Sequence, residues 1–307
     1  PGWTVLVQGV DLHRAAGRQL MDRFRFIPDA RIDDLMISHA SDGGGVGPHA
    51  DSYDVFLLQA HGRRRWRIAP PGPARPARLV PNQPLKLLAD FEPTEEWLLA
   101  PGDMLYLPPG WGHDGIAVGE CMTCSIGFRA PAPDELRRAF FASLADADDA
   151  DPAGSGSIRR RADTRYRDRA GTLTGRAASH PAEIPADMAS TLAGWLRGWR
   201  PGNRQIDDFI GRHLTEPKPT VWFEPGGPAA GRPIRLDRRT RMLYRREAVY
   251  INGEALRPPR AALALLQSLA DQRALDAAQA AVARRNAWLR DKLQDWLTAG
   301  WLRDADD

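Results

Sequence analysis

The chain places a histidine and a carboxylate two residues apart in a segment that reads as extended. The segment is GGGVGPHADSYDVFLLQAHGRRRWR, from Gly43 to Arg67, and the two residues are His49 and Asp51. Side chains at positions i and i+2 of a β-strand point to the same side, so these two converge on one point in front of a sheet. We therefore predict that His49 and Asp51 supply two ligands to one metal ion.

A third ligand candidate, His113, follows Asp51 by 62 positions, directly after PGDMLYLPPGWG. The Pro-Pro-Gly turn ends one strand and sets His113 at the start of the next strand. If the two histidine-bearing strands are neighbours in a barrel, His113 completes a face of two histidines and one carboxylate. Such a face, with open positions opposite, is typical of non-haem Fe(II) oxygenases.

The open positions of such an Fe(II) site commonly take a 2-oxo acid and O2, and oxidative decarboxylation then produces an oxidant that attacks unactivated C–H bonds. The far carboxylate of 2-oxoglutarate needs a fixed cation, and GRRRWR, Gly62 to Arg67, offers several arginines. If Arg64 and Trp66 face inward, the neighbouring arginines face outward. Because an unpaired buried charge is costly, we expect one functional arginine with solvated neighbours.

The ligands must be positioned by β-structure, because the chain from Arg31 to Arg129 is a series of short apolar runs separated by glycine and proline. This pattern predicts a sandwich or barrel, preceded by a helix over Asp11–Arg25. The glycines before His49 are expected to allow a tight turn and to leave room for a bulky substrate. The predicted strands are Asp33–Ser38, Tyr53–Gln59, Arg64–Ile68, Trp97–Leu99, Met104–Leu107, Gly115–Val118 and Met122–Phe128.

After Pro133 the pattern becomes helical, with apolar residues recurring every four positions, and an acidic stretch from Asp146 to Ser157 indicates a domain boundary. The arginine-rich segment Arg159–Arg176 reads as a solvated linker, although contact with RNA is an alternative. Two further apolar stripes then suggest either a homodimer interface or packing against the barrel. These stripes are Met188, Leu192, Trp195 and Trp199, and Ile206, Phe209, Ile210 and Leu214.

The last section, from about Arg232, predicts a winged-helix module. Two short strands, Arg241–Tyr244 and Ala248–Ile251, lead into a turn, and helices follow over about Arg260–Leu269 and Ala283–Thr298. Such modules often bind nucleic acid, but the acidic end of the chain argues against DNA binding here. The predicted domains are residues 1–145 (catalytic), 146–225 (linker and helical dimerisation region) and 226–307 (winged helix).

Composition agrees with a folded protein in a reducing, cytoplasmic setting. The chain has 307 residues, a net charge of +3 and only two cysteines, Cys121 and Cys124, which read as ordinary strand residues. No apolar run is long enough for a membrane span and no secretory leader is visible. The first residue is Pro1 rather than methionine, so we expect an amino-terminal piece to be missing.

The motifs GGGVGPHADSYDVFLLQ, GRRRWR and PGDMLYLPPGWGHDG, with SIGFRAP after them, resemble the Jumonji-C ribosomal oxygenases. The resemblance is closest to the bacterial group that hydroxylates an arginine of a large-subunit ribosomal protein, and it is dense from about Trp3 to Ala132. It implies a mostly β fold with helices: a double-stranded β-helix, then a helical dimerisation segment and a winged helix. It also implies homodimers that require Fe(II), 2-oxoglutarate and O2.

The same resemblance assigns roles to individual residues. It implies Fe(II) held by His49, Asp51 and His113, and 2-oxoglutarate paired with Arg64. From its place one alternation step from Ser125, we also expect Thr123 to contact 2-oxoglutarate. The positions that match the family's substrate-binding residues are Asp34, Met36, Tyr53 and Ser125. The carboxylate of Asp34 can pair with the guanidinium of a substrate arginine, and Met36 and Tyr53 can pack on either side of the alkyl stem of that arginine.

Three alternatives stay open. The barrel could bind a metal without oxygenase chemistry, as other cupins do, or the chain could be a regulator that senses a metabolite through the barrel and reads DNA through the winged helix. The third alternative keeps the oxygenase and changes its target to a histidine of another ribosomal protein or to RNA.

Overall fold

The computed structural model describes residues 2–71, 78–150, 190–191, 194, 201–226 and 233–304, and side chains within these ranges except at 145–150. It divides into two compact units, Pro1–Ala132 with Gly211–Asp307, and Pro133–Ile210. The predicted linker Arg159–Arg176 and the residues Met188, Leu192, Trp195 and Trp199 lie outside the described residues. None of the described helices is long and apolar enough to cross a membrane.

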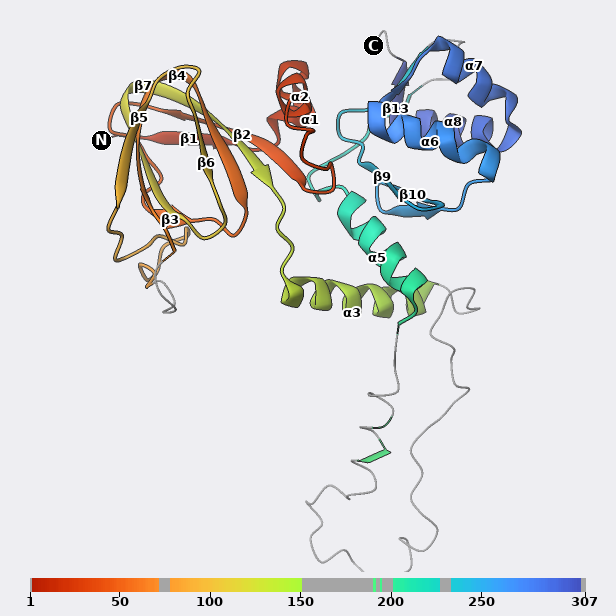
Figure 1. Ribbon diagram of the computed structural model, residues 1–307, viewed down its shortest axis with the longest axis horizontal. Coiled ribbons are helices and arrows are strands. Elements are labelled where there is room, and N and C mark those ends of the chain that lie inside the picture. Colours follow the sequence, from red (N-terminus) through yellow and green to blue (C-terminus); the bar gives the residue numbers. More distant parts are fainter. Residues whose placement is uncertain are drawn as a thin grey trace, which may run out of the picture. The chain divides into compact units, whose positions relative to one another are not determined.

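The first unit contains a seven-stranded antiparallel sheet that curls into a barrel (Figure 1). Its main path runs β1-β2-β7-β4-β5, while β3 pairs with β7 and β6 pairs with β4. The predicted β-rich barrel is therefore confirmed. Its strands are β1 (Thr4–Val7), β2 (Ile32–Ala40), β3 (His49–Ala50), β4 (Asp54–Ala69), β5 (Glu95–Leu99), β6 (Met104–Leu107) and β7 (Gly112–Phe128).

The two longest strands, β4 and β7, each join two segments that the sequence predicts as separate strands. In β4 the pairing with β7 shifts register between Gln59 and Arg63, and Gly62 has a positive φ of 60°. A bulge of this kind bends a strand without ending it. The predicted break was wrong because the glycine marks a bulge rather than a turn.

Two short helices, α1 (Val10–His13) and α2 (Ala15–Asp22), replace the single helix predicted over Asp11–Arg25. The break falls at Arg14, which has extended backbone angles. Met21 and Phe24 are buried, together with the outward-facing β2 residue Leu35 and the β7 residues Ile126 and Phe128. This cluster leaves the opposite face of β2 and β7 free to line the barrel interior.

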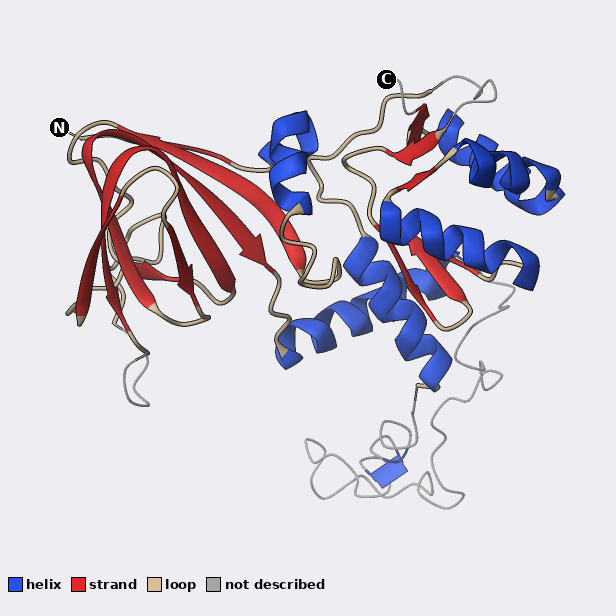
Figure 2. Ribbon diagram, turned by 45° about the horizontal axis from the view of Figure 1, so that its top comes forward, coloured by secondary structure: helices blue, strands red, loops and turns tan. Residues whose placement is uncertain are grey.

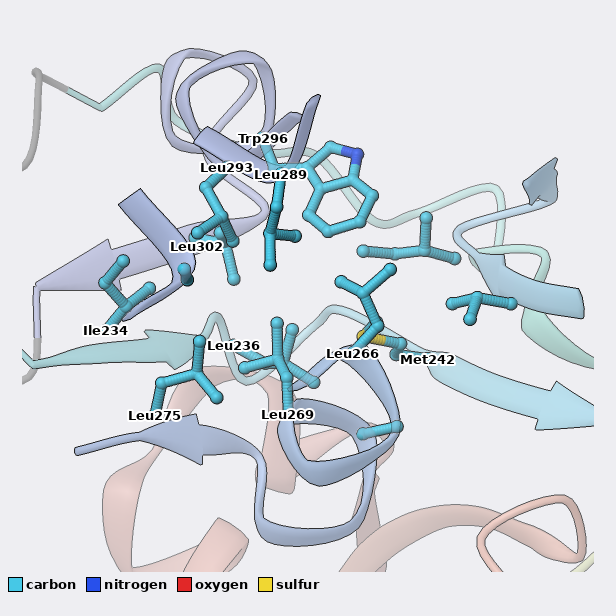
Figure 3. Close-up of a cluster of buried hydrophobic side chains, with 14 of the residues drawn as sticks. Ile234, Leu236, Met242, Leu266, Leu269, Leu275, Leu289, Leu293, Trp296 and Leu302 are labelled. Carbon is cyan, nitrogen blue, oxygen red and sulfur yellow. The ribbon is translucent and has the colours of Figure 1, made fainter. Parts of the chain in front are cut away.

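The carboxy-terminal part of the same unit has the predicted winged-helix elements around one apolar core, drawn in Figure 3. The predicted single helix over Ala283–Thr298 is divided, because Asn286 ends α7 and caps α8 through its side chain. The elements are β8 (Ile234–Leu236), β9 (Met242–Arg245), β10 (Ala248–Ile251), β11 (Glu254–Leu256), α6 (Arg260–Gln272), β12 (Ala274–Leu275), α7 (Ala277–Arg285), α8 (Ala287–Thr298) and β13 (Leu302–Asp304).

The described residues of the second unit are mostly helical (Figure 2). It contains α3 (Pro133–Ala150), as predicted after Pro133, and the first part of α5 (Asn203–Thr215). The rings of Phe140 and Phe209 meet edge to face with centroids 5.0 Å apart. The remainder of α5, from Gly211, belongs to the first unit.

Within the first unit, arginine side chains connect the barrel and the carboxy-terminal part by binding backbone carbonyls. Arg241 donates to the carbonyl oxygens of Ile32, at 3.1 Å, and Asp33, at 2.8 Å, at the start of β2. Arg129, just after β7, donates to the carbonyl of Leu214 at 3.4 Å. The beginning of β2 is thus held by groups far away in the sequence.

Candidate metal centre and its surroundings

His49, Asp51 and His113 come together in the barrel, with ligand atoms that all lie within 4.8 Å of one another. His49 on β3 and His113 on β7 are paired directly across the two strands, and Asp51 follows β3 immediately. The distance from His113 Nε2 to Asp51 Oδ2 is 3.7 Å. The expectation that the two histidine-bearing strands are neighbours is confirmed, and no other described residues form such a group.

Each histidine is oriented by a backbone carbonyl. The Nδ1 atom of His49 is 2.8 Å from the carbonyl oxygen of Gly47, and that of His113 is 3.1 Å from the carbonyl oxygen of Trp111. An Nδ1–H that donates to a carbonyl leaves the Nε2 lone pair for a metal, which is the usual support around a histidine ligand. Burial and the neighbouring His49 lower the pKa of His113, which favours the neutral, metal-binding form.

Tyr53 lies close to the carboxylate ligand Asp51. Burial and the charges of Asp51, Asp34 and Asp33 raise the pKa of the Tyr53 phenol. The phenol therefore stays protonated beside these carboxylates.

Arg64 is buried in the barrel and has no carboxylate partner among the described residues. It is only 3% exposed, Nη1 donates to Ser38 Oγ at 3.1 Å, and Nε donates to Cys121 Sγ at 3.4 Å. The Nη2 atom is buried without any hydrogen-bond partner. A buried guanidinium with a free donor and no counter-charge fits the carboxylate of a ligand, because the unpaired state is costly.

The other arginines of the GRRRWR motif lie as the alternation predicts. Arg63 and Arg65 are exposed, and Arg65 forms an ion pair with Glu96 at 3.2 Å. Arg67 is partly exposed and pairs with the buried carboxylate of Asp114. Only Arg64 of this run is buried with an unused donor at the end of its guanidinium, so it is the arginine best placed to receive a ligand carboxylate.

Trp66 is a site residue for which the sequence suggested no role. Its ring centroid lies 6.0 Å from that of His113 and 5.7 Å from Arg64 Cζ, and its Nε1 is buried without a partner. A Cβ on Gly115 would lie 2.6 Å from the Trp66 ring, so glycine is required there. Gly115 was the sequence signal for this packing, because a glycine inside a strand often marks a place where another group approaches the backbone closely.

Three buried polar side chains, Ser38, Gln59 and Thr123, lie near Arg64 in the barrel. Thr123 Oγ1 donates to Gln59 Oε1 at 2.8 Å, and Thr123 lies directly opposite Ser38 on the β2–β7 ladder. Thr123, predicted to contact 2-oxoglutarate, is thus in the same buried polar group as Arg64. Ser38 and Gln59 were not identified from the sequence because only the strand pairing brings them there.

The substrate residues implied by the family resemblance also gather in this barrel. Met36 on β2 is paired directly with Ser125 on β7. Asp34 shares the Met36 side of β2, and its Oδ2 accepts a hydrogen bond from Lys218 Nζ at 2.9 Å. A Cβ placed on Gly127 would lie 3.8 Å from the Tyr53 ring and 4.0 Å from Asp34 Oδ1. Gly127 therefore lies between these two side chains, and neither it nor Lys218 was singled out from the sequence.

The glycines before His49 form the predicted turn, but two of them do not leave the predicted space for substrate. Gly43 adopts a positive φ of 71°, as a tight turn requires. A Cβ on Gly44 would lie 2.3 Å from the Trp3 carbonyl oxygen, and one on Gly45 would lie 2.6 Å from that of Gly115. Gly44 and Gly45 are therefore small because other backbone segments pack directly against them.

The fold and the three-ligand face define a metal-binding β-barrel of the cupin type. Residues 19–136 match the family model of the JmjC domain, and residues 200–303 match that of the ROXA-like winged helix. The ribosomal protein uL16 3-hydroxylase of Escherichia coli is 46% identical over 45% of this chain and 36% of its own length. A probable ribosomal oxygenase of Haemophilus influenzae is 41% identical over 42% of the chain and 32% of its own length. Each of these sequence matches therefore spans about a third of the relative.

A solved structure of Escherichia coli YcfD superimposes with a TM-score of 0.77 at 30% identity, covering 98% of this chain and 78% of that one. Another, of YcfD with cobalt and 2-oxoglutarate, gives a TM-score of 0.76 at 28% identity, with the same coverage. The chain belongs to the Jumonji-C ribosomal oxygenase family. This confirms the predicted double-stranded β-helix followed by a winged helix.

Proposed function

We propose that this protein is an Fe(II)- and 2-oxoglutarate-dependent oxygenase that hydroxylates an arginine side chain of a large-subunit ribosomal protein. The observation that carries the proposal is the pairing of a His-Asp-His face with a buried guanidinium that lacks a counter-charge in the same barrel. Family membership supports it, since a relative is a ribosomal protein hydroxylase and YcfD has been solved with 2-oxoglutarate.

The donor set fits iron, because two neutral imidazoles and one carboxylate with open positions suit Fe(II). Bound iron would supply the redox chemistry by which 2-oxoglutarate and O2 become succinate and CO2 while the second oxygen atom enters a substrate C–H bond. The protein holds the metal through His49, Asp51 and His113, and Arg64 anchors the far carboxylate of the 2-oxo acid. Because Arg64 is already fixed by Ser38, it needs little reorganisation to receive that carboxylate.

The substrate side of the site suits a cationic side chain. The carboxylates of Asp33 and Asp34 lie at the start of β2, and Tyr53 lies close enough to both for their charges to raise its pKa. A planar guanidinium forms two parallel hydrogen bonds with a carboxylate, which fixes the orientation of the side chain that carries it. Met36 and Tyr53 would then pack against the alkyl stem, and Ser125, opposite Met36, would contribute a hydroxyl.

The test is incubation of the protein with Fe(II), 2-oxoglutarate and peptides from large-subunit ribosomal proteins, read by mass. The expected result is a gain of one oxygen on an arginine-containing peptide, lost when that arginine is replaced by glutamine. A gain on a histidine peptide or on RNA would change the target and keep the oxygenase. Consumption of 2-oxoglutarate with no oxidised peptide would refute the ribosomal-protein assignment, and no consumption at all would favour a cupin without oxygenase activity.

The proposal includes a homodimer in the cytoplasm, where a ribosomal protein would be met. Ile206, Phe209 and Ile210 of α5 remain candidate interface residues, with the tryptophans of the preceding stripe. Light scattering after size-exclusion chromatography should give twice the 34.0 kDa chain mass of this sequence. A single-chain mass across micromolar concentrations would refute the dimer, and retention of ribosomal RNA at low salt would support RNA contact.

A further inference from the structure

The carboxylate proposed to receive the substrate arginine is already paired with a cation of the same chain. Lys218 Nζ lies 2.9 Å from Asp34 Oδ2 and 3.2 Å from Asp33 Oδ1. The side chain of Asp34 is only 14% exposed, so this ion pair is largely shielded from water. Such a pair is stronger than one on an open surface.

The two carboxylates are not equivalent. Asp33 also lies 3.4 Å from Arg129 Nε and 3.9 Å from Arg241 Nη2. Among the described residues, Lys218 is the one cation within ion-pair distance of Asp34. If Lys218 leaves Asp34, it can stay paired with Asp33, whereas Asp34 then depends on an incoming cation.

Lys218 extends from a fixed backbone. It lies just after α5, where its carbonyl accepts a hydrogen bond from Val221 N at 2.9 Å. Nearby, Thr215 Oγ1 accepts from Gly253 N at 3.1 Å, which ties the end of α5 to the winged-helix part. Only the side chain of Lys218 therefore has to move to release Asp34.

We propose that Lys218 occupies Asp34 until a substrate cation displaces it, and that it thereby raises the intrinsic affinity that a cationic side chain must have to bind at this position. This inference rests on the proposed function, because it assumes that Asp34 receives the substrate cation. An arriving guanidinium replaces a single-point ammonium contact by two parallel hydrogen bonds, so the exchange is favourable. A substrate lysine meets the same competition with only a single-point contact of its own, so its binding stays weaker.

The competition has a measurable consequence for affinity. When a competing group occupies a site most of the time, the apparent dissociation constant exceeds the intrinsic one by the inverse of the free fraction. For a shielded ion pair of ordinary strength, this factor is about three to ten. Removing the ammonium should therefore tighten substrate binding, which is the opposite of what a substrate-contacting or orienting lysine would do.

The experiment compares Lys218→Met and Lys218→Arg with the wild-type protein and with Lys292→Met, a control that removes a lysine paired with Asp295 on α8. Binding of an arginine peptide and its lysine analogue is measured by fluorescence anisotropy with Co(II) and 2-oxoglutarate bound. We expect Lys218→Met to lower the dissociation constants of the arginine peptide and of the lysine peptide by the same factor, about three- to ten-fold. Lys218→Arg should raise both constants, because its own guanidinium is the stronger occupant, and Lys292→Met should change neither.

Weaker arginine-peptide binding by Lys218→Met, or unchanged binding, overturns the inference. If the wild-type protein binds no ribosomal peptide, the proposed substrate fails on its own, and free arginine then serves as the probe of Asp34. In that case tighter arginine binding by Lys218→Met, abolished by the further change Asp34→Asn, supports the inference, and equal binding by wild type and variant overturns it. Thermal melts of each variant establish that the fold is intact.

Discussion

His49 and His113 face each other across the β3–β7 pairing, with ring centroids 4.2 Å apart. Each ring is held at Nδ1 by the carbonyl of the residue two positions earlier in the chain. The metal-binding Nε2 atoms are thus oriented by backbone groups of the chain itself, as is usual around a histidine ligand.

The first prediction concerns metal affinity. His113→Ala should weaken Co(II) or Mn(II) binding about 100-fold or more, because a three-ligand site loses a ligand and the remaining two cannot enclose the ion. Isothermal titration calorimetry measures the change. The matched control is His39→Ala, an exposed histidine paired with Glu120, for which metal affinity should equal that of the wild type. Equal affinity in His113→Ala would place the metal elsewhere.

The second prediction separates function from stability at Arg64. Arg64→Met should raise the apparent KM for 2-oxoglutarate about 100-fold, since the far carboxylate loses its counter-charge. It should also keep or raise the melting temperature without ligand, because it removes a buried guanidinium that has no carboxylate partner. Succinate release and thermal melts report the two effects.

Arg65→Met, on the same strand but exposed, is the control for the Arg64 variant and should leave the KM for 2-oxoglutarate unchanged. A large fall in melting temperature for Arg64→Met with an unchanged KM would make Arg64 a structural residue instead.

The third prediction contrasts two glycines of β7. Gly115→Ala should destabilise the fold by about 1–3 kcal/mol, because the new Cβ would meet the Trp66 ring at 2.6 Å. Gly127→Ala meets Tyr53 and Asp34 only at 3.8 to 4.0 Å, so the fold should tolerate it while the methyl narrows the substrate position. Urea unfolding should therefore show a lower free energy of unfolding for Gly115→Ala than for Gly127→Ala. When only folded protein is compared, peptide affinity should fall in Gly127→Ala and not in Gly115→Ala. Unchanged peptide affinity in Gly127→Ala would show that the substrate side chain does not bind beside Tyr53 and Asp34.

The ligand pair and the inward arginine could be predicted from the sequence because they depend on strand alternation over a few residues. His49 with Asp51, and Arg64 with its outward neighbours, are of this kind. Ser38, Trp66 and Lys218 could not be predicted, because their roles arise from strand register and from a loop 184 positions away from Asp34. The bulge at Gly62 was taken for a turn for the same reason, since only the pairing of β4 with β7 shows that the strand continues.

The fourth prediction concerns pH. Asp11 is buried beneath β2, where its Oδ1 accepts from Leu35 N at 2.9 Å, and burial raises the pKa of its carboxyl above 3.8. The folded state therefore holds this proton more tightly than the unfolded state, so stability from this group is full below pH 3.8 and is lost as pH rises through the folded pKa. Asp11→Asn keeps the acceptor and removes the charge.

We expect Asp11→Asn to raise the melting temperature at pH 7.5, by an amount that shrinks as the pH falls towards 4.5. Melting curves across this range, with the exposed α3 carboxylate variant Asp134→Asn as control, measure the difference. A constant or reversed difference between Asp11→Asn and wild type would show that ionisation of Asp11 carries no cost in the folded protein.

The two hydrogen bonds from Arg241 to the carbonyls of Ile32 and Asp33 bear on how this architecture can change during evolution. They anchor the residues immediately before Asp34 with a side chain that belongs to the winged-helix part. An exchange of that part, together with the end of α5, for one from a distant homologue would also replace Lys218 and Arg241 and so alter the charge next to Asp33 and Asp34. The barrel and its carboxy-terminal partner should therefore be inherited together, and hybrids between lineages should differ from their parents in target preference even when every metal ligand is kept.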